Sequence, residues 1–393
     1  MQHPMNSAVA ITGLGLTEMG RVYRDAEDLA AEAVFLALED AGLHKSDLDG
    51  LLINAGISDG VGVPLHMTLG LQELDLLTYM QGYGSTAGQM VQYAAMAVAN
   101  GLATTVCCVF ADSPLKDKQR SGAVSYARSG PPNVMASLDT VYGFTGALPK
   151  YALAAQRHMD LFGTTQEHLA AVAISQRQWA GMNPRASKRE RLDLDAYNAS
   201  PWVVEPFHVL DCCLVSNGAV AVIVTSAERA RDLKQPPVYL RGFAQAHNHD
   251  TGQAGHDPLV HTAGARSAPR ALAMADVNVS DVSQCQIYDC YTYTVIVTLE
   301  DYGFCEKGEG GPFVADGHLG PGGALPTNTG GGELSSFYMW GMTPISEAVI
   351  QGRGQGGERQ APNDLIMVSG NGGVLAYHST LILSPHAAQG VGR

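Results

Sequence analysis

The order in which predicted strands and helices follow one another is repeated along this chain, and this repetition constrains the fold most strongly. The apolar run at residues 8–16 predicts a strand, and apolar residues at helical spacing predict a helix from Asp25 to Ala41. After Gln235–Pro236–Pro237, a sequence typical of a break between units, a strand at 238–243 and a helix at 268–275 begin the same order again. We therefore expect two similar α/β halves.

Both halves continue with alternating elements. The first half is predicted to contain strands at Gly50–Asn54, Leu74–Met80, Ala103–Ala111 and Ala219–Thr225, with helices at about 86–100, 149–160 and 165–181. The second is predicted to contain strands at Cys285–Asp289, 365–369 and 374–383, with helices at about 292–302 and Ser335–Gln351. We place the N-terminal half at residues 1–234, with a loop and helical insertion at about 112–182, and the C-terminal half at residues 235–393.

Composition and charge exclude several classes of protein. The 393 residues are 46% hydrophobic and long enough for a large core, and the seven cysteines lack CxxC spacing, so we expect neither a disulfide framework nor a metal or cofactor in this chain. A net charge of −14 argues against nucleic acid or an anionic membrane as a partner, because both require clustered basic residues. With no apolar run of about 20 residues and no signal-peptide pattern, we expect a cytoplasmic protein.

Three segments resemble thiolases of the sterol-carrier and lipid-transfer-protein branch. They are SNGAVAVIVTSAERAR at 216–231, YDCYTYTVIVTLEDYGFCEKGEGG at 288–311 and SGNGGVLAYHSTLIL at 369–383. The resemblance covers essentially the whole chain. It implies the thiolase fold, in which duplicated βαβαββ halves form a five-layered αβαβα arrangement, and it implies a homodimer.

The catalytic positions of that family are substituted here. Where thiolases carry the nucleophilic cysteine at a helix start, this chain has Ser85, and where they carry the histidine of a His-Asp-Cys-Phe motif, it has Tyr288. A second histidine, six residues after the N-P-x-G-G motif that Asn328–Gly332 matches, is replaced by Tyr338. The C-terminal catalytic position, Ser369–Gly373, offers no thiol. No nucleophile for Claisen chemistry is left.

Two tyrosines in a site built for acyl-CoA predict proton transfer without a covalent intermediate. In a β-hydroxyacyl-CoA thioester, loss of the β-hydroxyl proton breaks the Cα–Cβ bond and gives a ketone or aldehyde together with the enolate of a shorter acyl-CoA. We predict that Tyr288 and Tyr338 are the acid and base of this retro-aldol cleavage. A tyrosine of pKa near 10 is ionised only about one part in a thousand at pH 7, so it needs a depressed pKa or a partner that relays the proton.

This pattern resembles the cysteine-lacking lipid-transfer-protein aldolases of bacterial steroid side-chain degradation. The resemblance implies a sterol or bile-acid CoA thioester with a hydroxyl at ring carbon 17, cleaved to a 17-ketosteroid and a short acyl-CoA such as propionyl-CoA. It also implies a heterocomplex with a small protein made of an OB-fold and a zinc ribbon, so that any zinc would belong to the partner.

Further residues in the family motifs are candidates for substrate contact. The resemblance assigns Asn328 to a water or the thioester oxygen, Gly331 and Gly332 to close approach of the backbone to the thioester, and Asn371 and Gly373 to the same oxyanion site, with a backbone N–H from Gly373. Glu333 lies next to this loop. It is a candidate general base, or equally a surface or dimer contact.

Two other functions stay open. The chain is a thiolase-like acyltransferase if Ser85 is an activated nucleophile, but the sequence shows no base for it, and we prefer the interpretation that Ser85 caps its helix. A non-catalytic acyl-CoA or sterol carrier would bind the ligand and form no product.

Three weaker patterns favour ordinary structure. His247, His249 and His256 allow a metal site to be drawn, but a solvated loop is the commoner explanation. Gly13-Leu-Gly15 followed by Gly20 misses the dinucleotide spacing and predicts a strand end and turn. The basic residues of 120–128 are candidates for CoA phosphates, although a solvated loop is again the expectation.

Overall fold

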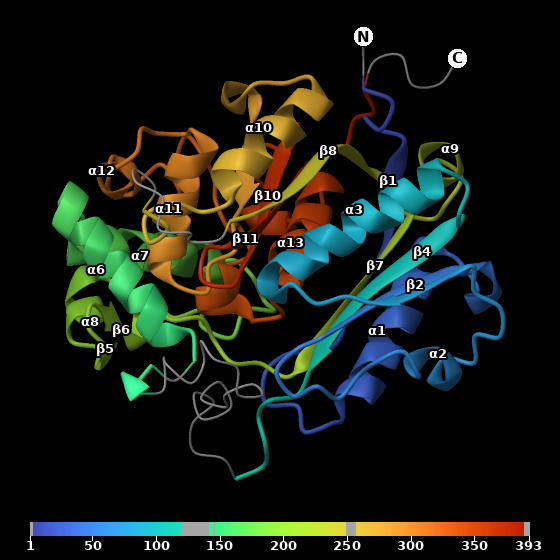
Figure 1. Ribbon diagram of the computed structural model, residues 1–393, viewed down its shortest axis with the longest axis horizontal. Helices are drawn as coiled ribbons and strands as arrows, with labels where there is room; N and C mark the ends of the chain where they lie inside the picture. Colours follow the sequence, from blue (N-terminus) through green and yellow to red (C-terminus); the bar gives the residue numbers. More distant parts are fainter. Residues whose placement is uncertain (1–2, 119–140, 145, 249–256, 389–393) are drawn as a thin grey trace.

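The computed structural model describes residues 3–118, 141–144, 146–248 and 257–388. Nine strands form one mixed sheet in the order β3-β2-β4-β7-β1-β8-β11-β10-β9 (Figure 1). Its strands are β1 (Val9–Leu16), β2 (Gly50–Ala55), β3 (Leu76–Tyr79), β4 (Thr105–Asp112), β7 (Gly218–Ser226), β8 (Val238–His247), β9 (Gln284–Gln286), β10 (Ile366–Gly372) and β11 (Tyr377–Ser384).

The two halves of the sheet have the same topology. The neighbours β2-β4-β7-β1 of the first half correspond to β9-β10-β11-β8 of the second. In each half the first pair is parallel and the other two pairs are antiparallel. The predicted duplication is therefore confirmed at the level of strand order and direction. The exact division at residues 234 and 235 stays a prediction.

Helices complete five layers. The helix α1 (Ala26–Ala41) packs on the outer face of the first half-sheet, and α10 (Gly264–Ala275) packs on the outer face of the second. Between the half-sheets lie α3 (Thr86–Ala99) and α13 (Met342–Gly352), which contact strands of both halves. The halves are joined because β1 pairs with β8, but only at Ala10 and Ile11, so the two half-sheets diverge and leave room for the central helices.

Close helix packing in both halves depends on glycine in the first strand. A Cβ atom on Gly13 of β1 would lie 2.4 Å from the carbonyl oxygen of Ala37 in α1. A Cβ atom on Gly242 of β8 would lie 2.1 Å from the carbonyl oxygen of Ala271 in α10. These glycines explain the local sequence better than a dinucleotide-binding turn does, because a side chain at either position would push the helix off the sheet.

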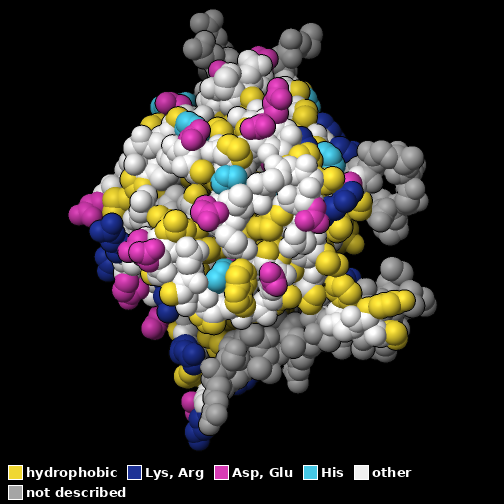
Figure 2. Space-filling view, turned by 90° about the vertical axis from the view of Figure 1, so that its left-hand side faces the viewer, with side chains coloured by type: hydrophobic (Ala, Val, Ile, Leu, Met, Phe, Trp, Pro, Cys, Tyr) yellow, Lys and Arg dark blue, Asp and Glu magenta, His cyan; other side chains and the backbone are white. Residues whose placement is uncertain are grey.

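A helical insertion lies at one end of the molecule, on the left of Figure 1. It contains α6 (Leu148–Phe162), α7 (Gln166–Gly181), α8 (Leu194–Asn198), β5 (Trp202–Val204) and β6 (Phe207–His208), and it packs near α11 (Thr292–Tyr302) and α12 (Gly310–Ala315). Figure 2 shows this end, where hydrophobic side chains are intermixed with acidic ones. The short helix α2 (Leu65–Thr68) lies between β2 and β3, and the short helix α9 (Ala227–Ala230) lies between β7 of the first half and β8 of the second.

A buried hydrogen-bond network fixes the insertion to the second half. The His158 Nε2 atom of α6 lies 3.0 Å from the Glu300 carboxylate of α11, and the Lys307 Nζ atom lies 3.1 Å from the same carboxylate. The side chains of His158 and Glu300 are fully buried. Because a buried carboxylate that loses a hydrogen-bond partner destabilises the fold, this network holds α6 beside the core.

The structure corrects two predicted elements. The strand predicted at Cys285–Asp289 ends at Gln286, and the helix predicted from Ser335 begins only at Met342. In place of its first part there is a π-helical turn, Gly332–Ser336, followed by extended backbone at Phe337 with φ of −157°. Apolar periodicity could not reveal this break, because the turn is held by a distant side chain, as described below.

Among the residues that the structure describes, no helix combines the length and the apolar character needed to cross a lipid bilayer.

The replacement Gly242→Ala is expected to lower the free energy of unfolding by about 1–3 kcal/mol, because the added methyl group overlaps the backbone of α10. A matched control is Gly62→Ala, where the nearest atom to a new Cβ is the Pro64 Cδ atom at 3.7 Å. Urea denaturation of both variants tests this. Equal midpoints for the two would contradict the packing argument.

Candidate active site

The structure brings Tyr288 and Tyr338 together. Their hydroxyl oxygens lie 2.8 Å apart, in hydrogen-bond distance, and the two side chains are 4% and 7% exposed. Tyr288 follows β9, and Tyr338 lies in the extended segment between the π-helical turn and α13. The backbone N–H of Tyr288 donates to Ser369 Oγ, and that of Tyr338 donates to Ser216 Oγ. Side chains from two other segments of the chain therefore hold the backbone of the two tyrosines in place.

Ser85 lies close to this pair but is not arranged as a nucleophile. The neighbouring Gly84 passes so near the Tyr288 ring that an added Cβ would lie 2.3 Å from it. The Ser85 side chain is fully buried, and its Oγ donates to the carbonyl oxygen of Gly82 at 2.7 Å and accepts from Gln89 Nε2 at 2.8 Å. Neither group is a base. The predicted helix cap is also wrong, because this hydroxyl makes no capping hydrogen bond to α3.

The loop Asn328–Gly332 supports the segment that carries Tyr288. Asn328 uses both ends of its side-chain amide on Ile287, accepting from the backbone N–H at 2.6 Å and donating to the carbonyl oxygen at 2.9 Å. Gly331 and Gly332 have φ of 98° and 60°, and a Cβ on either would collide with Ala180 or with the Asp289 carboxylate. Asn328 therefore positions the end of β9, which leads to Tyr288. Both ends of the Asn328 side-chain amide are used in hydrogen bonds to the backbone.

Asn371 and Gly373 differ in burial. Asn371 is fully buried on β10, where its Nδ2 donates to the Tyr151 hydroxyl at 3.2 Å. Among the described residues, its Oδ1 has no hydrogen-bond partner. Gly373 lies in the exposed turn between β10 and β11, with a φ of 59° that favours glycine, and packs against the ring of Tyr377. Asn371 therefore belongs to the buried cluster, whereas Gly373 lies at its rim.

A buried acidic pair links the two tyrosine segments. The Asp289 carboxylate accepts hydrogen bonds from the backbone N–H groups of Glu333 at 2.8 Å and Leu334 at 3.1 Å, which holds the π-helical turn. Burial raises the pKa of Asp289 to about 7. Glu333 is fully buried as well, so the surface or dimer interpretation of this residue is wrong.

Burial also raises the pKa of Tyr288 well above its ordinary value, and the nearby charge of Glu333 raises it further. The hydrogen bond from Tyr338 acts in the opposite direction. Of the two conditions set by the sequence, a depressed pKa is therefore not met at Tyr288, whereas a hydrogen-bonded partner is present in Tyr338.

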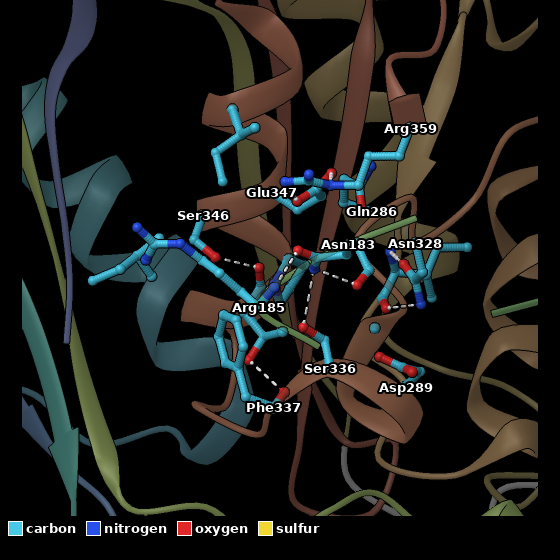
Figure 3. A pocket seen from close by; sticks show the side chains of 17 residues that line it. Asn183, Arg185, Gln286, Asp289, Asn328, Ser336, Phe337, Ser346, Glu347 and Arg359 are labelled. Atoms are coloured by element: carbon cyan, nitrogen blue, oxygen red, sulfur yellow. Dashed lines mark hydrogen bonds and ion pairs between the residues drawn. The ribbon is translucent and has the colours of Figure 1, made fainter. Parts of the chain in front are cut away.

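A narrow cavity lies behind the loop, between α13 and the segment after α7 (Figure 3). It has room for about one water molecule, about 20 Å³, and Asp289 and Asn328 reach its wall. The Glu347 carboxylate of α13 faces this cavity and is bound by Arg359 Nε at 3.0 Å and by the Thr329 hydroxyl at 2.9 Å. The side chains that line this cavity thus support the loop, because Glu347 binds Thr329.

The remaining sequence patterns lie largely outside the residues that the structure describes. Of the three histidines, His249 and His256 lie outside the described residues, and the ring of His247 packs against Tyr377. The basic stretch 120–128 also lies outside the described residues. Within the described ranges, no group of three or more His, Cys, Asp or Glu side chains is arranged to hold a metal ion.

Sequence reasoning missed Tyr151 and the role of Asp289. Tyr151 comes from α6, far from the motifs, and reaches Asn371 only because the insertion folds back on the core. Asp289 stands inside the matched motif, yet nothing in its local sequence shows that it binds the backbone of the next motif. The one available signal was that two acidic residues, Asp289 and Glu333, occur in motifs made otherwise of apolar and small residues.

A thiolase-type architecture with a tyrosine pair in place of its two histidines, and a serine in place of its nucleophilic cysteine, defines the class of protein. The family described as thiolase C-terminal domain-like matches residues 244–385. A steroid side-chain-cleaving aldolase of Thermomonospora curvata is 36% identical over 384 residues, which cover 93% of this chain and 96% of that protein. The 17-hydroxy-3-oxo-4-pregnene-20-carboxyl-CoA lyase of Mycobacterium tuberculosis is 34% identical, with coverage of 94% and 98%.

A solved structure named Ltp2-ChsH2(DUF35) aldolase superposes with a TM-score of 0.86 at 33% identity, covering 97% of this chain and 98% of that chain. The chain therefore belongs to the thiolase superfamily, and within it to the branch of the steroid side-chain-cleaving aldolases. It is a carbon–carbon lyase of thiolase fold.

The raised pKa of Asp289 predicts a pH dependence of stability. Between its ordinary pKa of 3.8 and about 7, the folded protein keeps a proton that the unfolded chain releases, so the free energy of unfolding falls as pH rises. Asp289→Asn should remove this component, which amounts to at most about 4 kcal/mol over the window. Denaturation curves at several pH values test this, with Asp364→Asn as an exposed control. An unchanged pH slope in Asp289→Asn would contradict the assignment.

Proposed function

We propose that this protein cleaves the side chain of a 17-hydroxysteroid CoA thioester by a retro-aldol reaction. The substrate is of the C22 type named for the mycobacterial relative, and the products are a 17-ketosteroid and propionyl-CoA or a similar short acyl-CoA. The observation that carries this proposal is the 2.8 Å contact between the hydroxyls of Tyr288 and Tyr338. It occurs where thiolases would have their histidines, next to a serine that no base activates.

The chemistry needs a proton to leave one substrate atom and reach another. The β-hydroxyl O–H bond breaks as its proton passes to one tyrosine, and the hydroxyl oxygen becomes the ketone oxygen. The electrons of the broken Cα–Cβ bond enter the enolate of the acyl-CoA, and a proton from the second tyrosine forms the new Cα–H bond. Since the two phenols share a hydrogen bond, the proton lost and the proton gained move through one connected pair. The reaction is redox-neutral and consumes no cofactor.

The cysteines support this assignment over acyl transfer. Cys290 and Cys213 lie near the tyrosine pair, and burial raises the pKa of both thiols well above the ordinary value. Nearby Glu333 raises both further. Because the thiolate is the nucleophile, thiols held in this neutral state are poor replacements for the cysteine that Ser85 substitutes.

The assembly is also part of the proposal. We infer a homodimer and a heterocomplex with a small OB-fold and zinc-ribbon protein, in which any zinc belongs to the partner. The heterocomplex is supported by the solved aldolase, whose name joins Ltp2 to ChsH2(DUF35). The homodimer and the architecture of the partner rest on the family resemblance alone. We place the complex in the cytoplasm, where CoA thioesters are made and used.

Replacing Tyr288 or Tyr338 with phenylalanine should lower kcat by about 100- to 10,000-fold, the usual contribution of a general acid or base, while the protein still folds and binds CoA thioester. The measurement follows 17-ketosteroid and propionyl-CoA by mass spectrometry after incubation with 17-hydroxy-3-oxo-4-pregnene-20-carboxyl-CoA. The enzyme is assayed alone and co-expressed with its partner. Turnover retained in both variants would refute the mechanism. Tight binding without product from the wild-type complex would favour a carrier.

Ser85→Ala should retain most of the turnover, because the Ser85 hydroxyl is committed to Gly82 and Gln89. Intact-mass analysis of the wild type during turnover should show no acyl adduct. An adduct on Ser85, lost in the alanine variant together with activity, would instead establish the acyltransferase.

A further inference from the structure

Glu333 is a buried acid whose carboxyl group is poorly satisfied. Its residue surface is 0% exposed, and within the described part of the chain neither carboxyl oxygen makes a hydrogen bond of normal geometry, although the backbone of Asp289 interacts with the carboxyl group and lowers its pKa. A carboxyl group buried without hydrogen bonds costs several kcal/mol of stability. Such a group is uncommon in folded proteins, and when it lies beside a reactive site it is a candidate for a functional role.

The backbone of Glu333 is tied to the segment that carries Tyr288. The Glu333 N–H donates to Asp289, the residue after Tyr288, and the Glu333 carbonyl oxygen accepts from the N–H of Leu214 at 2.9 Å. The backbone of Glu333 is therefore held between this segment and the segment before β7, and its charge is close enough to raise the pKa of Tyr288. Gly332, the preceding residue, has no space for a side chain because the Asp289 carboxylate would lie 2.3 Å from its Cβ.

The groups that face Glu333 are all neutral or acidic. Its charge acts on the phenols of Tyr288 and Tyr151 and on the thiols of Cys290 and Cys213, and the Asp289 carboxylate acts on Glu333 itself. None of these provides a positive charge. Burial, followed by the charge of Asp289, raises the pKa of Glu333 well above its ordinary value. Its carboxylate form is therefore a much stronger base than an exposed glutamate.

We propose that Glu333 is the terminal proton acceptor of the site and acts through the tyrosine pair. The inference rests on the proposed retro-aldol function. The substrate hydroxyl gives its proton to one tyrosine, that tyrosine gives its own proton to the other, and the second gives its proton to a carboxylate oxygen of Glu333. After the Cα–Cβ bond has broken, the proton returns along the same groups to the enolate carbon, and Glu333 is again a carboxylate.

This route resolves a difficulty of the tyrosine pair. Neither phenol can act as a base while both carry their protons, and the pKa of Tyr288 is raised. A nearby carboxylate of raised pKa is a stronger base than an exposed glutamate, and it accepts the proton without requiring a free phenolate. In the free protein no hydrogen bond joins Glu333 to the pair, so a water molecule or a shift on substrate binding must complete the path.

Glu333→Gln keeps the size of the side chain and removes its ability to take up a proton. We expect kcat to fall by about 100- to 10,000-fold with little change in KM, and we expect the rise of kcat with pH, which follows ionisation of Glu333, to disappear. Glu333→Asp should restore part of both. A wild-type kcat and pH profile in Glu333→Gln would overturn the proposal.

A matched control is Glu347→Gln, which removes another buried carboxyl on the neighbouring helix. Glu347 is bound by Arg359, Thr329 and Gln351, so its loss should lower the melting temperature and leave the shape of the pH profile unchanged. If both variants lost the rise of kcat with pH to the same extent, the rise would not depend on Glu333 in particular. That result would overturn the specific role of Glu333.

A half-reaction separates this inference from the proposed function. In D₂O with propionyl-CoA alone, the wild type should exchange the Cα protons of the thioester, and Glu333→Gln should not. Exchange that depends on Glu333 without steroid cleavage would support the relay and refute the proposed substrate. Steroid cleavage and exchange that both survive in Glu333→Gln would support the function and refute the relay.

Discussion

The carboxylate of Asp289 is the interaction on which the rest of the site depends. By accepting hydrogen bonds from the backbone of Glu333 and Leu334, it ties the end of β9 to the π-helical turn, although the two segments are more than forty residues apart. Tyr288 precedes Asp289 and Tyr338 follows the turn, so this tie brings the two phenols within 2.8 Å. These hydrogen bonds also hold the π-helical turn, which is followed by extended backbone at Phe337. The helix α13 therefore begins only at Met342.

The thiolase scaffold has been adapted here by changing side chains while its architecture is kept. The start of α3 still points at the site, but Ser85 is hydrogen-bonded into its own turn, and the neighbouring thiols are held neutral by burial. What the scaffold keeps is the buried position of these motifs, which a hydrogen-bonded phenol pair now occupies. Such a pair can move a proton without forming a covalent bond to a substrate.

The site is also notable for the polar groups it leaves unpaired. Within the described residues, neither carboxyl oxygen of Glu333 has a hydrogen-bond partner of normal geometry, and the Oδ1 of Asn371 has none either. By contrast, the Glu347 carboxylate is paired with Arg359. Unpaired buried atoms also occur elsewhere, for example on Arg353, but Glu333 is the only carboxyl group among them in the described part of the chain. Because an unpaired buried carboxyl group reduces stability, it is a candidate for a functional role.

The duplicated order of elements could be predicted from the sequence because the periodicities of strands and helices are local. The family and the positions of Tyr288 and Tyr338 could be predicted because motif positions can be counted along the chain. The three-dimensional structure was needed to show that the two hydroxyls meet, that the Asn328 side chain binds Ile287 and that Gly373 lies at the rim. It also decided that Glu333 is buried, not exposed. These facts depend on contacts between segments distant in sequence, and on desolvation, which a side chain acquires only when the layers close around it.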